Sequence, residues 1–444
     1  MPSPRYLSRR SAVTGAAGGL SALLAAACSS GGSQTPSGAA YKGSGPTIRL
    51  VYISQPKAPP EQAILDKLFV EFTAEFPRIQ VDIQPTSDVQ VIQKALQLHV
   101  AGSTADLVEH SRDGRDLRDS VKDIKPFMNR DKVNPNIFVP TAVEALSYEG
   151  KFMGIPIAIA VDALFYNPDI LRQIGLAPPP VTIDDRSWTM EKFQEYAIKL
   201  TQRPDRFGWG GNITGGFDWM DAATYFGVGI WDAKTEKVLV NTAEFKRGLQ
   251  YWTDLYTRHA VVPTGDEVRA MGNARTGLGA GKVAMEIDAV PPPTIQTKLA
   301  LAALPYSGPG KNISGRMSPS VVFAGNASQL DATWEVLKWT LEPGRAARQA
   351  DARRTVVAGL LKAAEITRKT FQDQTGIDPQ PWFTQANSSK FVAWGMYAYP
   401  ETETVARAEI TPRFQNELLT GKMSVNDFAL FAEQQLKGAI AKGK

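Results

Sequence analysis

Hydrophobic positions in the first part of the chain recur with the periods of strands and helices in turn. Apolar runs and strict alternation predict strands over residues 48–53, 79–83 and 105–108. Apolar residues at helical spacing predict helices over residues 60–76 and 89–100, the first of which Pro77 ends. A β-α-β-α-β run of this kind predicts a parallel, doubly wound sheet. Ligands of such sheets bind beyond the carboxyl ends of the strands, so residues 54–57 and 109–113 are expected to face a cleft.

A second pattern occupies residues 148–171, where an aromatic-glycine turn precedes two apolar runs. The runs, residues 155–161 and 163–166, predict buried strands, and one carboxylate, Asp162, lies between them. Burying a bare carboxylate is costly. We therefore expect Asp162 to lie where the chain crosses from one sheet to another and to face a water-filled cleft. A surface carboxylate at a strand end of a single domain fits the same pattern.

The same periodicities predict further elements up to the C-terminus. Helices are expected over residues 188–200 with Thr189 as N-cap, and over 220–226, 241–259, 333–341, 414–421 and 425–436. Strands are expected over residues 299–305 and 320–324, together with a hairpin over 231–240 that turns near 235–236. The second crossing between the sheets is placed near residues 321–325. Trp252, Trp334 and Trp339 sit among apolar residues at helical spacing and are assigned to the core.

The N-terminus has the pattern of an export signal. Three arginines precede a short apolar run over residues 12–27, which is too short to span a membrane as a mature helix. Residues 8–10, Ser-Arg-Arg, look like a twin-arginine signal, and residues 24–28, Leu-Ala-Ala-Ala-Cys, resemble a lipoprotein cleavage box that lipidates Cys28. The Gly/Ser/Pro-rich stretch that follows predicts a flexible tether. Residues 1–27 are thus expected to be a signal peptide, and residues 28–46 a lipid-anchored tether.

Charge and cysteine content exclude several classes of function. The formal net charge is +4 over 444 residues, and removal of the signal's three arginines leaves the mature chain close to neutral. No run of Lys and Arg stands out, which argues against nucleic acid and against a polybasic membrane patch. Cys28 is the only cysteine, so intramolecular disulfides, CxxC redox chemistry and multi-cysteine zinc sites are excluded.

Catalytic and cofactor motifs are not found. His99, His110 and His259 lie in separate predicted elements without the spacing of paired metal ligands. The glycine run before Lys282 fails as a phosphate loop, because its glycine spacing is wrong and a valine follows the lysine. No G-x-S-x-G nucleophile elbow occurs. We therefore expect no enzyme activity, no metal and no cofactor.

Aromatic residues are instead frequent in predicted loops. A flat aromatic surface beside carboxylate or amide acceptors suits a sugar, which offers apolar C–H faces and rings of hydroxyls. Core packing of the same rings is the alternative at each position. The loop aromatics are Trp209, Phe217, Trp219, Trp231, Trp382, Trp394, Tyr397 and Tyr399.

Two motifs around Asp162 carry a family resemblance. G-K-x-x-G-I-P at residues 150–156 is followed from residue 163 by A-L-F-Y-N-P-D-I-L-x-x-x-G-L-x-x-P-P. These motifs resemble the bacterial extracellular solute-binding proteins of ABC importers, in the carbohydrate-binding branch typified by maltose-binding protein. Residues 281–285, G-K-V-A-M, resemble the family's entry to another strand. The resemblance covers nearly all of residues 47–444 and is weakest over 342–381.

The resemblance implies an α/β, two-lobed periplasmic-binding-protein-like fold, in which each discontinuous lobe is a sheet flanked by helices and the lobes are joined by a hinge. Residues 47–161 and 322–378 are expected to form lobe 1, and residues 162–321 and 379–444 lobe 2. A ligand would bind in the cleft between the lobes.

The resemblance also implies contacts with the ligand from specific residues. Asp162 occupies the position of a carboxylate that reaches the ligand from the first crossing, and Asp113 follows the third strand. Asp288 stands where family members often carry an aromatic, and this departure leaves the class of sugar open. Arg316, before the second crossing, could meet an anionic group or form a surface ion pair. The full expected set is Asp113, Asp162, Trp209, Phe217, Asp218, Trp219, Trp231, Asp288, Arg316, Trp394 and Tyr397.

The function that these observations predict is a solute-binding receptor of an ABC import system. It would be exported, anchored by lipid on Cys28 to the outer face of the cytoplasmic membrane, monomeric, and would present its closed form with a carbohydrate-like solute to the permease. Two alternatives stay open: a binding protein for an anionic or peptide-like solute, and an exported glycan-acting enzyme, which would need two acids about 5 to 9 Å apart in one cleft.

Overall fold

The structure is a computed structural model of the whole chain. It describes residues 38–54, 59–86, 91, 94, 97–98, 105–110, 121–211, 219–222, 224–232, 235–292, 294–306, 317–325, 329–352, 356–388 and 400–443.

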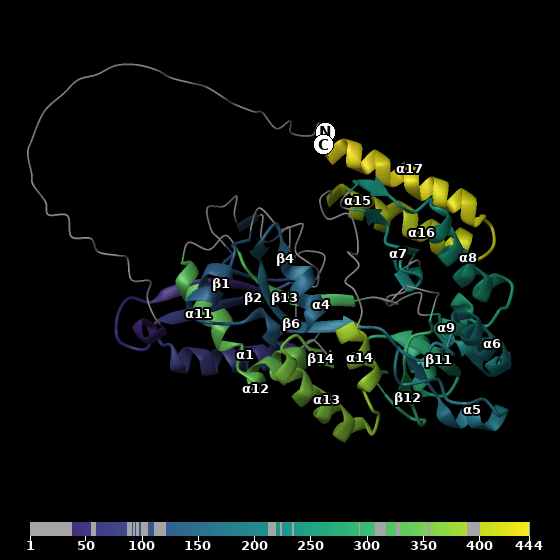
Figure 1. Ribbon diagram of the computed structural model, residues 1–444, viewed down its shortest axis with the longest axis horizontal. Coiled ribbons are helices and arrows are strands. Elements are labelled where there is room, and N and C mark those ends of the chain that lie inside the picture. Colours follow the sequence, from purple (N-terminus) through teal and green to yellow (C-terminus); the bar gives the residue numbers. More distant parts are fainter. Residues whose placement is uncertain are drawn as a thin grey trace, which may run out of the picture. The chain divides into compact units, whose positions relative to one another are not determined.

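A six-stranded sheet with the order β14-β6-β13-β3-β1-β2 forms the centre of the first lobe (Figure 1). Its strands are β1 (Ile48–Ser54), β2 (Ile79–Pro85), β3 (Leu107–His110), β6 (Gly154–Val161), β13 (Met317–Ala324) and β14 (Val357–Ala358). The strands β2, β1 and β3 are parallel, as predicted, and the helix predicted over residues 89–100 lies largely outside the described residues. The rest of the sheet is antiparallel, since β13 opposes both β3 and β6. The chain enters β13 from the other sheet rather than through a helical crossover, so the parallel rule does not apply to it.

Helices cover the first sheet because their apolar faces fit it. In α1 (Pro59–Glu75), Leu65, Leu68 and Phe72 are 2% exposed or less, as the helical spacing predicts. The ring of Phe72 lies edge-on to that of Trp339, with centroids 5.4 Å apart. The other helices of this lobe are α3 (Lys125–Arg130), α4 (Pro140–Leu146), α11 (Leu330–Trp339), α12 (Pro343–Asp351) and α13 (Leu361–Thr375).

A four-stranded sheet with the order β12-β7-β11-β8 forms the centre of the second lobe. Its strands are β12 (Ala300–Ala302), β7 (Ala163–Tyr166), β11 (Val283–Asp288) and β8 (Phe207–Trp209). The strand β11 begins within the G-K-V-A-M motif, at Val283, as expected of an entry to a strand, and is antiparallel to β7. A small antiparallel hairpin, β9 (Trp231–Asp232) with β10 (Lys237–Val238), confirms the predicted turn near residue 235.

The predicted helices of the second lobe are present. The helix α6 (Met190–Leu200) begins at the predicted N-cap, where the Thr189 hydroxyl accepts a hydrogen bond from the Lys192 backbone N–H at 3.2 Å. The last helix, α17, lies beside α15 and α8 (Figure 1). The helical elements are α5 (Pro168–Ile174), α7 (Trp219–Ala222), η4 (Thr224–Phe226), α8 (Ala243–Thr257), α9 (Gly265–Met271), α10 (Ala274–Gly279), α15 (Pro400–Val405), η5 (Ala406–Ile410), α16 (Thr411–Arg413), η6 (Phe414–Leu418) and α17 (Val425–Gly443).

Two connections between the sheets follow from the strand assignment. The chain leaves the first sheet after Val161 and enters the second at Ala163. It returns between β12 and β13, and β13 begins at Met317, ahead of the predicted crossing at residues 321–325. Residues 317–321 pair with β6 of the first sheet, although Ser318, Pro319 and Ser320 do not follow the alternation of a strand. The other predicted lobe boundaries stay predictions.

A core cluster shared by both lobes joins the two sheets. It contains Ile159 and Val161 of β6, and Phe165 of β7, all 1% exposed or less. The helix α14 (Gln380–Ser388) contacts strands of both sheets. Continuous packing therefore accompanies the chain where it passes from one sheet to the other.

The predicted tether is partly folded. Residues 38–46 lie against the first lobe, where Tyr41 of η1 (Gly38–Tyr41) is only 5% exposed and belongs to the first core. The Arg78 side chain donates a hydrogen bond to the Ala40 carbonyl at 2.5 Å, and Lys42 pairs with Glu75 at 3.0 Å. The expectation of a flexible tether up to residue 46 is wrong for this segment, because one aromatic anchor and two cations offset its Gly/Ser/Pro-rich composition.

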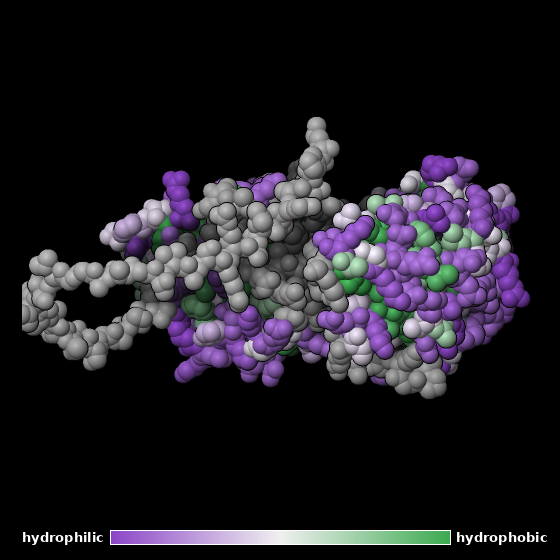
Figure 2. Space-filling model, turned by 90° about the horizontal axis from the view of Figure 1, so that it is seen from above, coloured by the Kyte–Doolittle hydropathy of each residue, from purple (hydrophilic) through white to green (hydrophobic). Residues whose placement is uncertain are grey.

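The surface over the described residues is largely hydrophilic in the view of Figure 2, with small apolar areas between polar ones. The large apolar side chains that are most exposed, Val70 at 70% and Leu430 at 48%, belong to different helices. Across the described part of the chain, no helix combines the length and apolar character that crossing a membrane requires.

Candidate functional site

Asp162 lies at the junction between the two sheets, as predicted. It is the single residue between β6 of the first sheet and β7 of the second. Its side chain is buried, with 3% of the residue exposed, and one oxygen, Oδ2, accepts a hydrogen bond from the Tyr225 hydroxyl at 2.7 Å. The sequence led us to expect water as the partner. A buried hydroxyl from the second lobe provides this hydrogen bond instead, which meets the need of a desolvated carboxylate.

Tyr225 reaches Asp162 from the second core. It lies in η4 and is 2% exposed, and its ring packs edge-on against Trp252 with centroids 5.3 Å apart. No sequence motif marks it, because it is 63 residues away from its partner. The crossing is thus held from the second lobe by a side chain that the sequence did not identify.

Asp288 lies next to the crossing, at the end of β11, where it is opposite Ala163 in the strand register. It is 1% exposed and accepts hydrogen bonds from Arg275 of α10, from Nε to Oδ2 at 2.5 Å and from Nη2 to Oδ1 at 3.1 Å. Its Oδ1 also accepts from the backbone N–H groups of Ala289 and Val290 at 2.7 and 3.1 Å. The carboxylate therefore fixes the turn after β11, and Arg275 is a second residue that sequence reasoning missed.

Two of the predicted aromatic contacts lie in the second core. Trp209 is fully buried, packs 4.9 Å from Trp252 between ring centroids, and donates its indole N–H to Glu286 at 3.2 Å. Trp219 is also fully buried, and its indole N–H is directed at the Thr411 hydroxyl at 3.2 Å. Core packing, the alternative open at the sequence level, thus describes the surroundings of both rings. Trp231 in β9 is half-buried.

The fully buried Glu286 influences the groups around it. Burial raises the pKa of Tyr256 well above its usual value, and the negative charge of Glu286 raises that pKa further. The Tyr256 hydroxyl donates to the Gly211 carbonyl at 2.6 Å. A Cβ at Gly210 would lie 2.0 Å from Glu286 Oε2, so a side chain there would have to displace this carboxylate. Hydrogen bonds to Glu286 and from Tyr256 therefore hold the segment Trp209–Gly211 beside this acid.

Trp382 was predicted as a loop aromatic, and the structure places it in helix α14. It is 1% exposed, and its indole N–H donates to the Asp288 carbonyl at 3.3 Å. Near it, the Thr141 hydroxyl of α4 donates to the Ala386 carbonyl of α14 at 3.0 Å. One helix thus contacts the first lobe and the turn after β11 together.

Six predicted contacts and the lipidation site lie outside the described residues, namely Asp113, Phe217, Asp218, Arg316, Trp394, Tyr397 and Cys28. Their roles stay predictions. Among the residues that the structure describes, no group of three His, Cys, Asp or Glu side chains converges as metal ligands.

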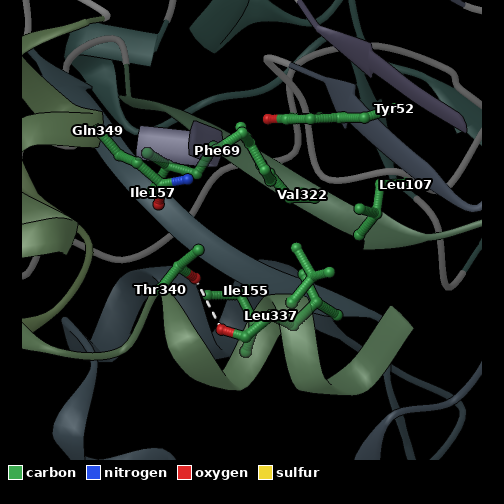
Figure 3. Close-up of a pocket in the computed structure, with 10 residues that line it drawn as sticks. Tyr52, Phe69, Leu107, Ile155, Ile157, Val322, Leu337, Thr340 and Gln349 are labelled. Atoms are coloured by element: carbon green, nitrogen blue, oxygen red, sulfur yellow. Dashed lines mark hydrogen bonds between the residues drawn. The ribbon is translucent and has the colours of Figure 1, made fainter. Parts of the chain in front are cut away.

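A small cavity inside the first lobe is too small to be a solute site (Figure 3). Its volume is about 10 Å³, near the minimum for one water molecule. Apolar side chains form most of its wall, and the Thr340 hydroxyl beside it donates to the Leu337 carbonyl at 2.7 Å. It is a gap in the packing between the sheet and its helices.

Comparison with known proteins identifies the class. The profile of the family described as bacterial extracellular solute-binding protein matches residues 57–347, and the chain belongs to this family. The maltotriose-binding protein of Pyrococcus abyssi (strain GE5 / Orsay) is 25% identical over 298 residues, 63% of this chain and 60% of the relative. The chain thus matches less than two thirds of the length of that curated relative.

Solved structures agree on the fold. An ABC substrate-binding protein from Listeria monocytogenes in complex with cycloalternan superposes with a TM-score of 0.69 at 17% identity, over 89% of this chain and 99% of that one. The sugar-binding protein MalE from the phytopathogen Xanthomonas citri gives 0.70 at 17% identity, over 89% and 98%. This likeness confirms the predicted α/β, two-lobed fold.

Proposed function

We propose that this protein is the extracytoplasmic receptor of an ABC import system and that its solute is a carbohydrate. The observation that carries the proposal is the buried carboxylate of Asp162 at the crossing between two sheets, in a chain of the extracellular solute-binding family. A carboxylate at a seam between lobes accepts hydrogen bonds from a guest that touches both lobes. Proteins named for maltotriose and other sugars are among its relatives and structural neighbours, which supports a sugar as the guest.

The surroundings of each side chain in the structure divide the proposed residues into two groups. Asp162 and the half-buried Trp231 are proposed to touch the solute. The Asp162 carboxylate would accept hydrogen bonds from hydroxyl groups of the solute, and the ring of Trp231 would pack against an apolar face of it. Trp209, Trp219 and Asp288 are proposed to support the binding site without touching the solute. The two rings pack in the core of the second lobe, and Asp288 holds the turn after β11. The further contacts proposed are Asp113, Phe217, Asp218, Arg316, Trp394 and Tyr397.

Closure of the two lobes is the proposed mechanism. A solute that touches both lobes binds the closed form more tightly than the open form and so shifts the population towards it. Moving that population from 1:99 to 99:1 takes about 5.5 kcal/mol of differential affinity, a share of the roughly 8 kcal/mol of micromolar binding. The permease would then recognise the closed receptor.

Export and anchoring complete the proposal. The signal over residues 1–27 would direct export, and lipid on Cys28 would hold a monomeric receptor at the outer face of the membrane. Replacement of Cys28 by serine should release the protein from the membrane fraction. A Cys28→Ser protein that stays membrane-bound would contradict lipid anchoring and leave the binding function untouched.

Tryptophan fluorescence during solute titration tests the proposed substrate class. The solutes are maltotriose and mannotriose as neutral sugars, phosphate and citrate as anions, and trialanine as a peptide. We expect saturable changes with at least one sugar, and weaker binding of the same sugar by Asp162→Asn. A response to an anion or to the peptide alone would refute the carbohydrate class, and release of shorter sugars would reveal an enzyme.

A further inference from the structure

The hydrogen bond between Tyr225 and Asp162 links an element of the second core to the crossing itself. Both residues are 3% exposed or less, and the hydroxyl lies 2.7 Å from the Asp162 Oδ2 atom. Hydrogen bonds to an ionised acceptor are short and about twice as strong as neutral ones. In a buried site such a bond fixes the direction of the carboxylate.

The ring of Tyr225 packs into the second core, so the hydroxyl that donates this hydrogen bond comes from a closely packed part of the lobe. Trp252, which lies 5.3 Å from it, is fully buried and also packs against Trp209 and Phe193 of the second lobe. Close packing of this kind leaves the tyrosine little freedom to follow a moving carboxylate. The hydrogen bond from Tyr225 therefore ties the Asp162 carboxylate to the second lobe, although Asp162 directly follows β6 of the first sheet.

We propose that Tyr225 is a positioning residue that fastens the Asp162 carboxylate to the second lobe and orients it towards the solute. This inference rests on the proposed function. The hydroxyl holds one carboxylate oxygen in place, so hydroxyl donors of a bound sugar meet a preorganised acceptor.

A matched control is available in the same core. The Tyr251 ring also packs against Trp252, with centroids 5.0 Å apart, and its hydroxyl donates to the Met190 carbonyl at 2.6 Å, away from the crossing. Tyr251→Phe removes a buried tyrosine hydroxyl at a comparable structural cost. It should leave the orientation of Asp162 unchanged.

Calorimetric titration with maltotriose and mannotriose of the wild type, Tyr225→Phe, Asp162→Asn, the double variant and Tyr251→Phe tests the proposal. We expect Tyr225→Phe to bind about tenfold more weakly, a loss of about 1.4 kcal/mol, and Tyr251→Phe to stay within about twofold of the wild type. Because Tyr225 acts through Asp162, the double variant should bind no more weakly than Asp162→Asn alone. Wild-type affinity in Tyr225→Phe, or multiplied losses in the double variant, would overturn the proposal.

A second double-mutant cycle, measured on stability without solute, distinguishes failure of the proposed function from failure of the positioning role. Urea unfolding of the wild type, Tyr225→Phe, Asp162→Asn and the double variant should show a coupling between Tyr225 and Asp162, because each single variant removes the hydrogen bond between the hydroxyl and the carboxylate. If the wild type binds no sugar, the proposed function fails and the positioning role for a solute fails with it. If the wild type binds sugar and the unfolding cycle shows no coupling, only the positioning role is refuted.

Discussion

Trp382 is the residue whose replacement tests the junction between the lobes most severely. Its ring lies edge-on to Phe165 of β7 and to Phe371 of α13, with centroids 5.3 and 5.4 Å away. Its indole N–H donates to the Asp288 carbonyl at 3.3 Å. We predict that Trp382→Ala strongly destabilises the protein and uncouples the two lobes.

The magnitude follows from complete burial. A buried tryptophan replaced by alanine loses about 3–5 kcal/mol through lost transfer energy and the cavity left behind. Loss of the hydrogen bond at the Asp288 carbonyl adds about 1 kcal/mol. The sum places the loss for Trp382→Ala at about 4–6 kcal/mol, and the loss for Trp382→Phe, which keeps a ring, at about 1–2 kcal/mol.

Urea unfolding followed by far-ultraviolet circular dichroism measures the loss. Trp339→Ala is the control, because Trp339 is 6% exposed and lies within the first core alone. We expect both alanine variants to lose stability, and only Trp382→Ala to unfold in two separate transitions, since its cluster contains residues of both sheets. A Trp382→Ala protein that loses less than about 1 kcal/mol in a single transition would refute this reasoning.

Three further predictions concern other parts of the chain. Hydrogen bonds from Arg130, and further ones from Lys338 and Trp334, hold the pKa of the Asp131 carboxyl well below its usual range. The ionised Asp131 carboxylate therefore stabilises the fold fully above its unfolded-state pKa of about 4, and this stabilisation is lost as the pH falls from there towards the lower folded-state pKa. Asp131→Asn should thus lower the free energy of unfolding by about 2 kcal/mol at pH 7 and by about 1 kcal/mol less at pH 3. An equal urea-unfolding cost at both pH values would contradict this. A Cβ on Gly208 would lie 1.8 Å from a backbone carbonyl oxygen of α6, so Gly208→Ala should lower the free energy of unfolding by about 3 kcal/mol. Gly43 has open space around it, so the control Gly43→Ala should be nearly neutral. Similar melting temperatures of the two variants would argue against the close approach at Gly208. Arg78→Ala should speed tryptic cleavage after Lys42, because it frees the docked N-terminal segment, and an unchanged cleavage rate would show that the docking does not protect this bond.

Local pattern was enough to predict much of the fold. The helical spacing of Leu65, Leu68 and Phe72 and the N-cap at Thr189 both reflect local rules, and both elements formed as predicted. The position of Asp162 followed from one acid between two apolar runs. These features depend on neighbours a few residues away, which a single sequence displays directly.

Features that depend on distant partners could not be predicted in this way. Tyr225 and Asp162 are 63 residues apart, and no periodicity relates them. Trp209 was expected to contact the ligand, and it lies in the second core. Its ring packs against Phe193 and Trp252, residues of two other elements that no local pattern places beside it. Tyr41 docks within a stretch whose composition is typical of linkers, since one aromatic side chain does not change an average.

Small-angle X-ray scattering of the mature protein, with and without a saturating concentration of the sugar that it binds best, tests the central claim most directly. A solute clamped at the seam of two lobes should reduce the radius of gyration, and Asp162→Asn should need more sugar to reach the same reduction. A radius of gyration that stays the same when sugar saturates the wild-type protein would contradict the account.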